Sequence, residues 1–320
     1  MTRALAIMMD PIHTIKPAKD TSLALLLEAQ QRDYALFYME QGDLALRDGV
    51  PLARLAPLQV EDRNSNWFTL GEGSWCDLRT MDIVLARKDP PVDSQFIYDT
   101  FVLEAAQRAG VRVINDPCAL RDCNEKLFAL QFPQCIAPTL VSRDAKELRR
   151  FVSTYGEAVL KPLDGMGGRG IFRVRDGDSN LNSMLETLLG GDANGQHRRF
   201  TLAQKFIPEI NTGDKRILLV DGEPLPYALA RIPQGKEFRG NLAAGGHGEG
   251  VALSERDYWI AAQLAPELCR RGLRFVGLDV IGSYLTEINI TSPTCMRELD
   301  QQYGLHTAAM LFDAITKTTS

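Results

Sequence analysis

Short apolar segments alternate with helical patterns over the first 120 residues, and this alternation limits the fold more than any other feature of the sequence. Strands separated by helices usually join into a parallel sheet with helices on its faces. We therefore predict an N-terminal α/β domain, with residues 48–74 as an excursion that contains a hairpin. Ligands of such sheets gather at the loops that follow the strands, here 10–13 and 87–91. The predicted strands are 4–9, 36–39, 83–87 and 111–114, and the predicted helices are 21–32 and 96–109.

The pattern changes after Asn124. Helical patterns cover 126–131 and 145–155, and two β-type runs at 158–161 and 171–174 flank a glycine-rich segment. The chain ends in a predicted hairpin and a terminal helix, so we expect α+β structure to follow the α/β domain. No internal repeat interrupts this organisation.

The composition excludes several classes of protein. With 45% hydrophobic residues and a net charge of −5, the chain is too apolar for intrinsic disorder. Its negative charge argues against nucleic acid or an anionic membrane as the main partner, and no run approaches the roughly 20 apolar residues that cross a bilayer. The six cysteines and four histidines lack metal-ligand spacing. These features predict a soluble, cytoplasmic protein with reduced thiols.

The segment from Lys161 to Phe172 holds four glycines within six positions. Gly165, Gly167 and Gly170 match G-x-G-x-x-G, but a β-type run follows where a dinucleotide fold needs a helix. Strand, glycines and strand instead form a hairpin flap whose backbone N–H groups fold over phosphates, and Lys161 would add a fixed positive charge. The alternative interpretation is a tight hairpin that needs positive φ angles.

Residues 275–290 indicate a second β-hairpin, and its second strand carries Glu287 and Asn289. Residues two apart share a face, so both side chains are expected on the face of Leu285, with the residues between them on the other. Mg²⁺ would offset the cost of burying these oxygens. Asp279 joins them only if the turn has three residues, because a two-residue turn places it on the other face. The alternative is a partly solvated strand face.

A second glycine-rich stretch, 231–250, is long and polar for a connection inside a compact domain. We expect a lid or binding loop in which Arg231, Lys236 and Arg239 meet an anionic intermediate. A surface loop without function is the alternative.

Several segments, spread in order over the chain, together resemble the bacterial glutathione synthetases of the ATP-grasp superfamily. The resemblance covers essentially the whole chain and agrees with its length. The segments are Leu160-Lys-Pro-Leu-Asp-Gly-Met-Gly-Gly168, Arg87-Lys-Asp-Pro-Pro91, Leu120-Arg-Asp-Cys-Asn-Glu-Lys126, Gly240-Asn-Leu-Ala-Ala-Gly-Gly246 and Leu285-Thr-Glu-Ile-Asn-Ile-Thr-Ser-Pro-Thr294.

The resemblance implies an N-terminal α/β domain at 1–123 and an ATP-grasp domain in two parts, a small subdomain at 124–204 and a C-terminal subdomain at 205–320. It implies that ATP, with Mg²⁺ or alternatively Mn²⁺, phosphorylates the cysteinyl carboxylate of γ-glutamylcysteine. The amine of glycine then attacks the acyl phosphate. A homo-oligomer, either a dimer or a tetramer, is expected on the same ground.

The resemblance also implies a role for each matching residue. The nucleotide site would comprise Lys126, Lys161, Asp164, Gly165, Gly167, Gly168, Gly170, Gln204, Lys205, Phe206 and Ile207. Arg216, Arg231, Arg239 and Asn241 would surround the acyl phosphate, Arg87, Ser292 and Thr294 would hold the peptide substrate, and Asp279, Glu287 and Asn289 would bind the metal.

Three residues depart from the family pattern: Arg169, Lys205 and His247. Two rival functions share the glycine loop and the acidic hairpin. One is another ATP-grasp ligase, of the D-alanine–D-alanine or glutamate ligase type, which would lack the segments at 87–91 and 241–246. The other is a nucleotide-binding regulatory module without catalysis, whose mark would be a missing metal ligand.

Overall fold

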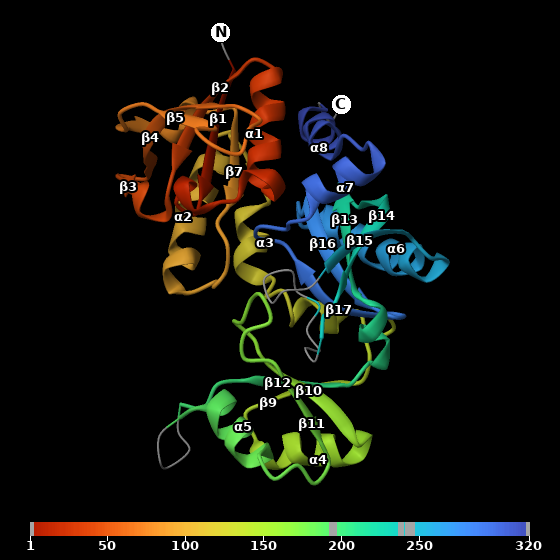
Figure 1. Cartoon of the computed structure of the whole chain (residues 1–320). Coiled ribbons are helices and arrows are strands. Elements are labelled where there is room, and N and C mark those ends of the chain that lie inside the picture. Colours follow the sequence, from red (N-terminus) through yellow and green to blue (C-terminus); the bar gives the residue numbers. More distant parts are fainter. Residues whose placement is uncertain (1–2, 192–196, 236–239, 241–246, 318–320) are drawn as a thin grey trace.

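The computed structural model describes residues 3–191, 197–235, 240 and 247–317, which form three sheets with helices packed against them (Figure 1). The described helices are α1 Thr21–Gln31, α2 Ser94–Arg108, α3 Pro117–Asp122, α4 Ala145–Tyr155, α5 Leu181–Leu189, α6 Glu255–Arg270, α7 Met296–Tyr303 and α8 Thr307–Thr316. The described strands are β1 Arg3–Met9, β2 Tyr34–Met39, β3 Leu44–Arg47, β4 Val50–Val60, β5 Phe68–Leu70, β6 Ser74–Asp77, β7 Ile83–Arg87, β8 Arg112–Ile114, β9 Thr139–Ser142, β10 Glu157–Pro162, β11 Phe172–Arg175, β12 Thr201–Lys205, β13 Asp214–Val220, β14 Glu223–Ile232, β15 His247–Ala252, β16 Phe275–Ile281 and β17 Tyr284–Asn289.

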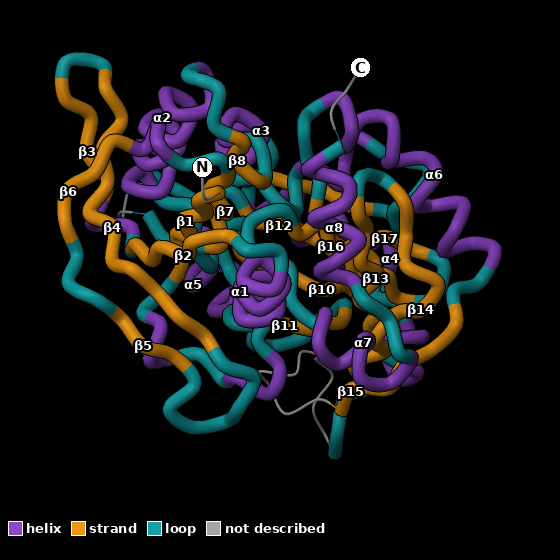
Figure 2. The backbone as a smooth tube through the Cα atoms, turned by 90° about the horizontal axis from the view of Figure 1, so that it is seen from above, coloured by secondary structure: helices purple, strands orange, loops and turns teal. Residues whose placement is uncertain are grey.

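The first sheet has the order β3-β4-β2-β1-β7-β8, and β1, β2, β7 and β8 run parallel, which confirms the α/β prediction. Its helices begin at aspartate caps: Asp20 accepts a hydrogen bond from the backbone N–H of Leu23, and Asp93 accepts one from Phe96. The predicted excursion at 48–74 contains a hairpin of β4 and β5, and it extends the sheet because β4 pairs antiparallel with β2. In Figure 2 these added strands stand at one side of the molecule, opposite α6.

The second sheet, β11-β10-β12-β9, is antiparallel and forms the lower lobe in Figure 1. Its core is separate: side chains of α4 and α5 such as Leu148 and Leu185 pack on Leu160 and Ala203. The glycine-rich segment connects β10 to β11, which confirms the strand–glycines–strand prediction. The predicted helix at 126–131 is wrong, since the chain forms only a short 3-10 turn there. Phe132 and Pro133 leave too few residues to repay helix nucleation.

The third sheet, β15-β14-β13-β16-β17, is antiparallel and shares its hydrophobic core with the first sheet. The segment before β9 runs along its edge strand: the N–H of Ile288 donates to the carbonyl of Glu125 (2.9 Å), and the N–H of Leu285 donates to that of Cys135 (2.8 Å). This path carries residues 125–135 of the chain directly past the second strand of the acidic hairpin.

The described residues include no helix with the length and apolar character that crossing a membrane requires. The domain boundaries after residues 123 and 204 stay predictions, and the second lies one residue before the end of β12.

Candidate active site

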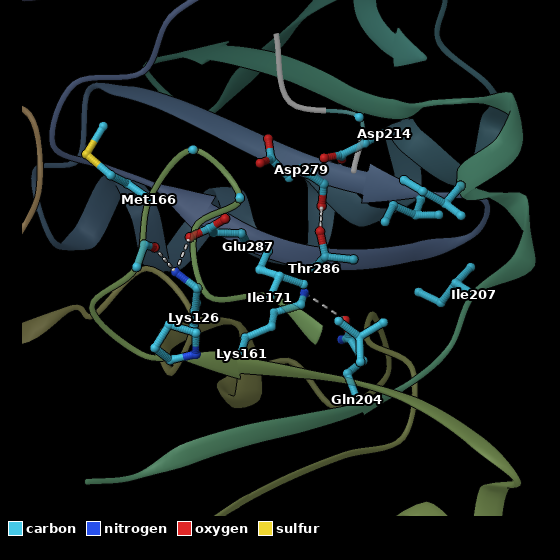
Figure 3. Close-up of a pocket in the computed structure, with 18 of the residues that line it drawn as sticks. Lys126, Lys161, Met166, Ile171, Gln204, Ile207, Asp214, Asp279, Thr286 and Glu287 are labelled. Carbon is cyan, nitrogen blue, oxygen red and sulfur yellow. Dashed lines mark hydrogen bonds and ion pairs between the residues drawn. The ribbon is translucent and has the colours of Figure 1, made fainter. Parts of the chain in front are cut away.

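A cavity lies between the second and third sheets, and residues from both project into it (Figure 3). Its floor is the β16–β17 hairpin, and the loop between β10 and β11 covers it. Its lining includes predicted nucleotide residues, namely Lys126, Lys161, Gly165, Gly167, Gly168, Gln204, Lys205, Phe206 and Ile207, together with Asp279 and Glu287. Of the three departures from the family pattern, Arg169 and Lys205 line this cavity, whereas His247 is exposed at the start of β15.

Lys126 and Lys161 approach the cavity from different elements. The Lys126 Nζ donates to the carbonyl of Gly165 (2.7 Å) and to Glu287 Oε1 (2.8 Å). Burial alone would lower the pKa of Lys126, but the Glu287 carboxylate outweighs it and raises that pKa. Lys161 donates to the Gln204 side chain (3.2 Å), and burial lowers the pKa of Lys161 despite the nearby Glu287. A half-buried ammonium whose hydrogen-bond partner among the described residues is the neutral Gln204 side chain is suited to an anion.

The glycine loop needs its glycines for two reasons. A Cβ at Gly165 would lie 2.8 Å from Pro162 Cγ and 3.1 Å from the Arg169 carbonyl oxygen, so the backbone passes too close for a side chain. Gly167, Gly168 and Gly170 have φ angles of +61°, +79° and +68°, which other residues adopt only at a cost. The loop therefore both folds tightly and presents backbone to the cavity.

The acidic hairpin brings Asp279 directly opposite Glu287, although its turn has two residues, because Ile281 pairs with Tyr284. The expectation that only a three-residue turn could bring Asp279 to Glu287 is therefore wrong. A β-bulge at Thr286 restores the pairing instead, and it places Thr286 in the cavity wall with Glu287. Leu285 packs in the core, so its predicted place on the face of Glu287 is also wrong.

Two buried arginines of adjacent strands enclose Asp279. Arg216 Nε lies 2.6 Å from Asp279 Oδ1, and Arg231 Nη2 lies 2.9 Å from Oδ2. Burial would raise the pKa of Asp279, but the two guanidinium groups outweigh it and hold that pKa far below its ordinary value. Arg231 also pairs with Asp214 (2.6 Å), whose pKa burial raises to about 6 despite Arg231.

A second cavity of about 220 Å³ adjoins the first, and Met166, Gly167, Asp279 and Glu287 line both. The remaining lining brings together the first and third sheets. It comprises Asp89, Pro90, Glu125, Arg216, Arg231, Asn289, Thr291, Ser292, Thr294 and Cys295.

Some predicted residues lie elsewhere. Asp164 and Gly170 are exposed and line neither cavity. Arg87 is buried beside the second cavity without lining it. Arg239 and Asn241 lie outside the described residues, as does Lys236.

Sequence reasoning missed Glu125 and Asp214. Glu125 Oε1 accepts hydrogen bonds from the N–H of Ile290 (3.0 Å) and from the Thr291 hydroxyl (3.0 Å). Burial, and then the Glu287 charge, raise the pKa of Glu125 to about 7. Its position beside Lys126 was the only available signal, because its partners lie more than 160 residues away.

Among the described residues, no three His, Cys, Asp or Glu side chains are grouped to hold a metal ion by themselves. Asp279 on β16 and Glu287 on β17 supply two carboxylates, and the predicted third ligand, Asn289, carries an amide and lies on β17 with Glu287. The Asn289 Nδ2 donates to the carbonyl of Gly277 (3.1 Å), which leaves Oδ1 as the ligand atom.

Structures with low sequence identity share the fold. D-cycloserine synthetase DcsG superposes with a TM-score of 0.67 at 16% identity, over 98% of this chain and 100% of that one. D-alanyl-alanine synthetase A from Vibrio cholerae gives 0.60 at 13% identity, over 99% of each chain. The ATP-grasp ligase PsnB, in a structure with a precursor, Mg and ADP, gives 0.62 at 14% identity, over 99% of each.

Sequence comparisons are more specific. A glutathione synthetase of Xanthomonas axonopodis pv. citri is 62% identical over 98% of both chains, and one of Pseudomonas aeruginosa is 55% identical over 98% of both. The model of the prokaryotic glutathione synthetase N-terminal domain matches residues 4–121, and that of the ATP-grasp domain of the same enzymes matches 125–304. The chain therefore belongs to the prokaryotic glutathione synthetase family of ATP-grasp ligases.

Proposed function

We propose that the chain joins γ-glutamylcysteine to glycine, with ATP and Mg²⁺ or alternatively Mn²⁺, and releases glutathione, ADP and phosphate. One observation carries the proposal: two adjoining cavities share the glycine loop and the acidic hairpin, with Lys126 and Lys161 in the first and Arg216 and Arg231 in the second. The glutathione synthetases that are 52–62% identical to the chain support the choice of substrates.

The first cavity would hold ATP. Lys126 and Lys161 would contact the phosphates, and the backbone of residues 165–168 would close over them. The adenine would lie against the strand end at 204–207, where Phe206 and Ile207 provide apolar surface and the backbone provides donors and acceptors.

The metal ligands would be Asp279, Glu287 and Asn289, whose oxygens suit the hard Mg²⁺ ion. When bound, the ion would neutralise charge that develops on the phosphates during transfer. In its absence Lys126 neutralises Glu287, and the two arginines neutralise Asp279.

The second cavity would hold the reacting carboxylate of γ-glutamylcysteine. An oxygen of that carboxylate attacks the γ-phosphorus of ATP, and ADP leaves. Arg216 and Arg231, held in place by Asp279, would stabilise the negative charge of the acyl phosphate. The uncharged amine of glycine then attacks the acyl carbon, phosphate leaves, and the amine nitrogen loses a proton.

Exclusion of water is the remaining requirement, since an acyl phosphate hydrolyses. Met166 and Gly167 of the glycine loop line both cavities, so the segment that covers the nucleotide also borders the intermediate. We therefore infer that positioning, charge and exclusion of water account for catalysis, without a covalent nucleophile on the chain.

The rival functions are less well supported. D-alanyl-alanine synthetase A shares the fold at only 13% identity. A regulatory module without catalysis would lack a metal ligand, whereas Asp279, Glu287 and Asn289 are all present and line one cavity.

Phosphate release from ATP tests the proposal when γ-glutamylcysteine and glycine are added separately and together. We expect rapid release only with both, and a product with the mass of glutathione. Release that ignores both substrates, or that needs D-alanine, contradicts the proposal.

We also propose a homo-oligomer, a dimer or a tetramer. Two large apolar side chains one turn apart on α2, Tyr98 (60% exposed) and Phe101 (50%), remain exposed, and adjacent exposed apolar side chains are typical of association surfaces. Light scattering over a concentration series would distinguish the oligomer from a monomer.

A further inference from the structure

The face of the second sheet that borders the first cavity carries a row of polar side chains across three strands. Gln204 on β12 pairs directly with Thr139 on β9 and with Val159 on β10. Lys161 lies two residues beyond Val159 on the same strand and therefore shares its face, whereas Leu160 between them packs in the separate core of this lobe. Gln204 and Lys161 line the cavity, but Thr139 is half-buried and lies outside the lining. Any effect of Thr139 on a ligand must therefore pass through Gln204.

The hydrogen bonds along this row all run in one direction. Lys161 Nζ donates to Gln204 Oε1 (3.2 Å), a contact that Figure 3 shows. Gln204 Nε2 donates to Thr139 Oγ1 (3.3 Å), and the Thr139 hydroxyl donates to the carbonyl of Ala137 (2.8 Å). Each group thus donates to the next, from the lysine ammonium to a backbone carbonyl.

The row permits one orientation of the Gln204 amide. If the amide were turned over, its NH2 group would face the Lys161 ammonium, so that two donors would meet. Its oxygen would face the Thr139 oxygen, whose proton is already donated to Ala137. Gln204 is only 5% exposed, so a misplaced amide would lose its hydrogen bonds without replacement by bulk water.

Lys161 depends on this orientation. The hydrogen-bond acceptor of its ammonium group among the described residues is Gln204 Oε1, and burial lowers the pKa of Lys161. An acceptor stabilises the charged form of a lysine and fixes the direction of Nζ. A lysine that contacts phosphates needs both.

We propose that Thr139 is a positioning residue of the nucleotide site: its hydroxyl fixes the Gln204 amide, and the amide directs the Lys161 ammonium into the first cavity. The inference rests on the proposed function, because it takes ATP as the ligand of that cavity. It assigns a role in nucleotide binding to a side chain that does not line the cavity.

Thr139→Val removes the hydroxyl and preserves the shape of the side chain. We expect the Kd for ATP with Mg²⁺ to rise at least about tenfold, since the hydrogen bonds that support a charged group are disturbed. Thr139→Ser should recover most of the affinity. Titration calorimetry with ATP and Mg²⁺, without the other substrates, measures these constants.

Thr154→Val on α4 is the matched control in the same lobe. The exposed Thr154 hydroxyl also donates to a backbone carbonyl, that of Arg150 (2.7 Å). This variant should bind ATP as the unaltered protein does.

A Gln204→Met background separates positioning from a general effect on the fold. Met has a similar length but no amide, so Thr139 has nothing to orient. In this background Thr139→Val should change the Kd for ATP by less than about twofold, because a residue that acts only through Gln204 has no further effect once the amide is gone.

An equal effect of Thr139→Val in both backgrounds would show that the hydroxyl acts through the packing of β9, and it would overturn the proposal. An unchanged Kd in Thr139→Val alone, or no recovery in Thr139→Ser, would also overturn it. Melting curves identify the variants that fold, and Thr139→Ala replaces Thr139→Val in both backgrounds if the latter does not. An unaltered protein that binds no ATP contradicts the proposed function instead, so the two failures are distinguishable.

Discussion

At the scale of single residues, the candidate site is a set of opposite charges that neutralise one another. Lys126 lies 2.8 Å from Glu287, and Arg216 lies 2.6 Å from Asp279. Removing one partner of such a buried pair leaves the other uncompensated, which usually costs more than the pair contributes. Substitutions here must therefore preserve shape if they are to report on function.

Glu287→Gln preserves shape and removes charge. We expect turnover to fall at least about 100-fold, since the loss of a metal ligand removes several kcal/mol of charge stabilisation. The fold should persist, because Gln keeps an acceptor for Lys126. Steady-state turnover and a melting curve of the same sample check both parts, and near-normal turnover would exclude Glu287 from the metal site.

Glu125→Gln should change how stability depends on pH. Burial and Glu287 raise the pKa of Glu125 to about 7, so the folded state favours the protonated side chain. The resulting contribution to stability is fully present below the pKa of the unfolded state and is lost as the pH rises through 7. Gln does not titrate. Between pH 5 and pH 8, the free energy of unfolding of the variant should therefore rise relative to that of the unaltered protein. Chemical denaturation in the presence of EDTA measures both free energies.

Glu147→Gln, which makes the same substitution at an exposed carboxylate on α4, is the matched control for Glu125→Gln. A relative stability of Glu125→Gln that moves the other way with pH would contradict the raised pKa.

At the scale of elements, the glycine loop and the acidic hairpin face each other across the first cavity (Figure 3). Each depends on a local irregularity, namely positive φ angles in the loop and a bulge in the hairpin. The loop is also held directly, because the Gly165 carbonyl accepts the Lys126 hydrogen bond.

Gly165→Ala should raise the KM for ATP by about tenfold or more, because the added Cβ would lie 2.8 Å from Pro162 and displace the loop. Gly42→Ala is the control, since a Cβ there meets nothing within 4 Å and its φ is not positive. Nucleotide titration of both variants gives the comparison. An unchanged KM in Gly165→Ala would mean that the loop position does not matter for ATP.

The sequence could predict features that depend on neighbouring residues. Alternating patterns predicted the parallel sheet, and the β-type run after Gly170 predicted the hairpin. The bulge at Thr286 could not be predicted, because a period of two contains no sign of one inserted residue. Glu125 was missed for a different reason. Its significance comes from Ile290 and Thr291, which only folding brings near it.

At the scale of the whole molecule, the three sheets are joined by contacts between distant parts of the chain. Arg32 at the end of α1 donates to Asp313 on α8 (2.7 Å), and the first and third sheets share one core. The second sheet has its own core, so ligands in the first cavity contact two separately packed units.

ATP together with Mg²⁺ should raise the melting temperature by more than the sum of the shifts from each alone. Phosphates alone would draw Lys126 from Glu287 and leave a carboxylate unpaired, and the metal alone would compete with Arg216 and Arg231 for Asp279. A ligand at 100 times its Kd adds about 3 kcal/mol of stability, which scanning calorimetry resolves. Additive shifts would contradict this coupling.

The position of β16 in the third sheet has a consequence for synthesis of the protein. β16 lies between β13 and β17, yet it is made some 55 residues after β13 ends, so Asp279 and Glu287 reach the cavity only after β14, β15 and α6 have been made. A ribosome-bound or prematurely terminated chain would already possess Lys126, Lys161 and the glycine loop. If it ended before β16, it would lack the carboxylates, and it could therefore not consume ATP before the acidic hairpin has been made.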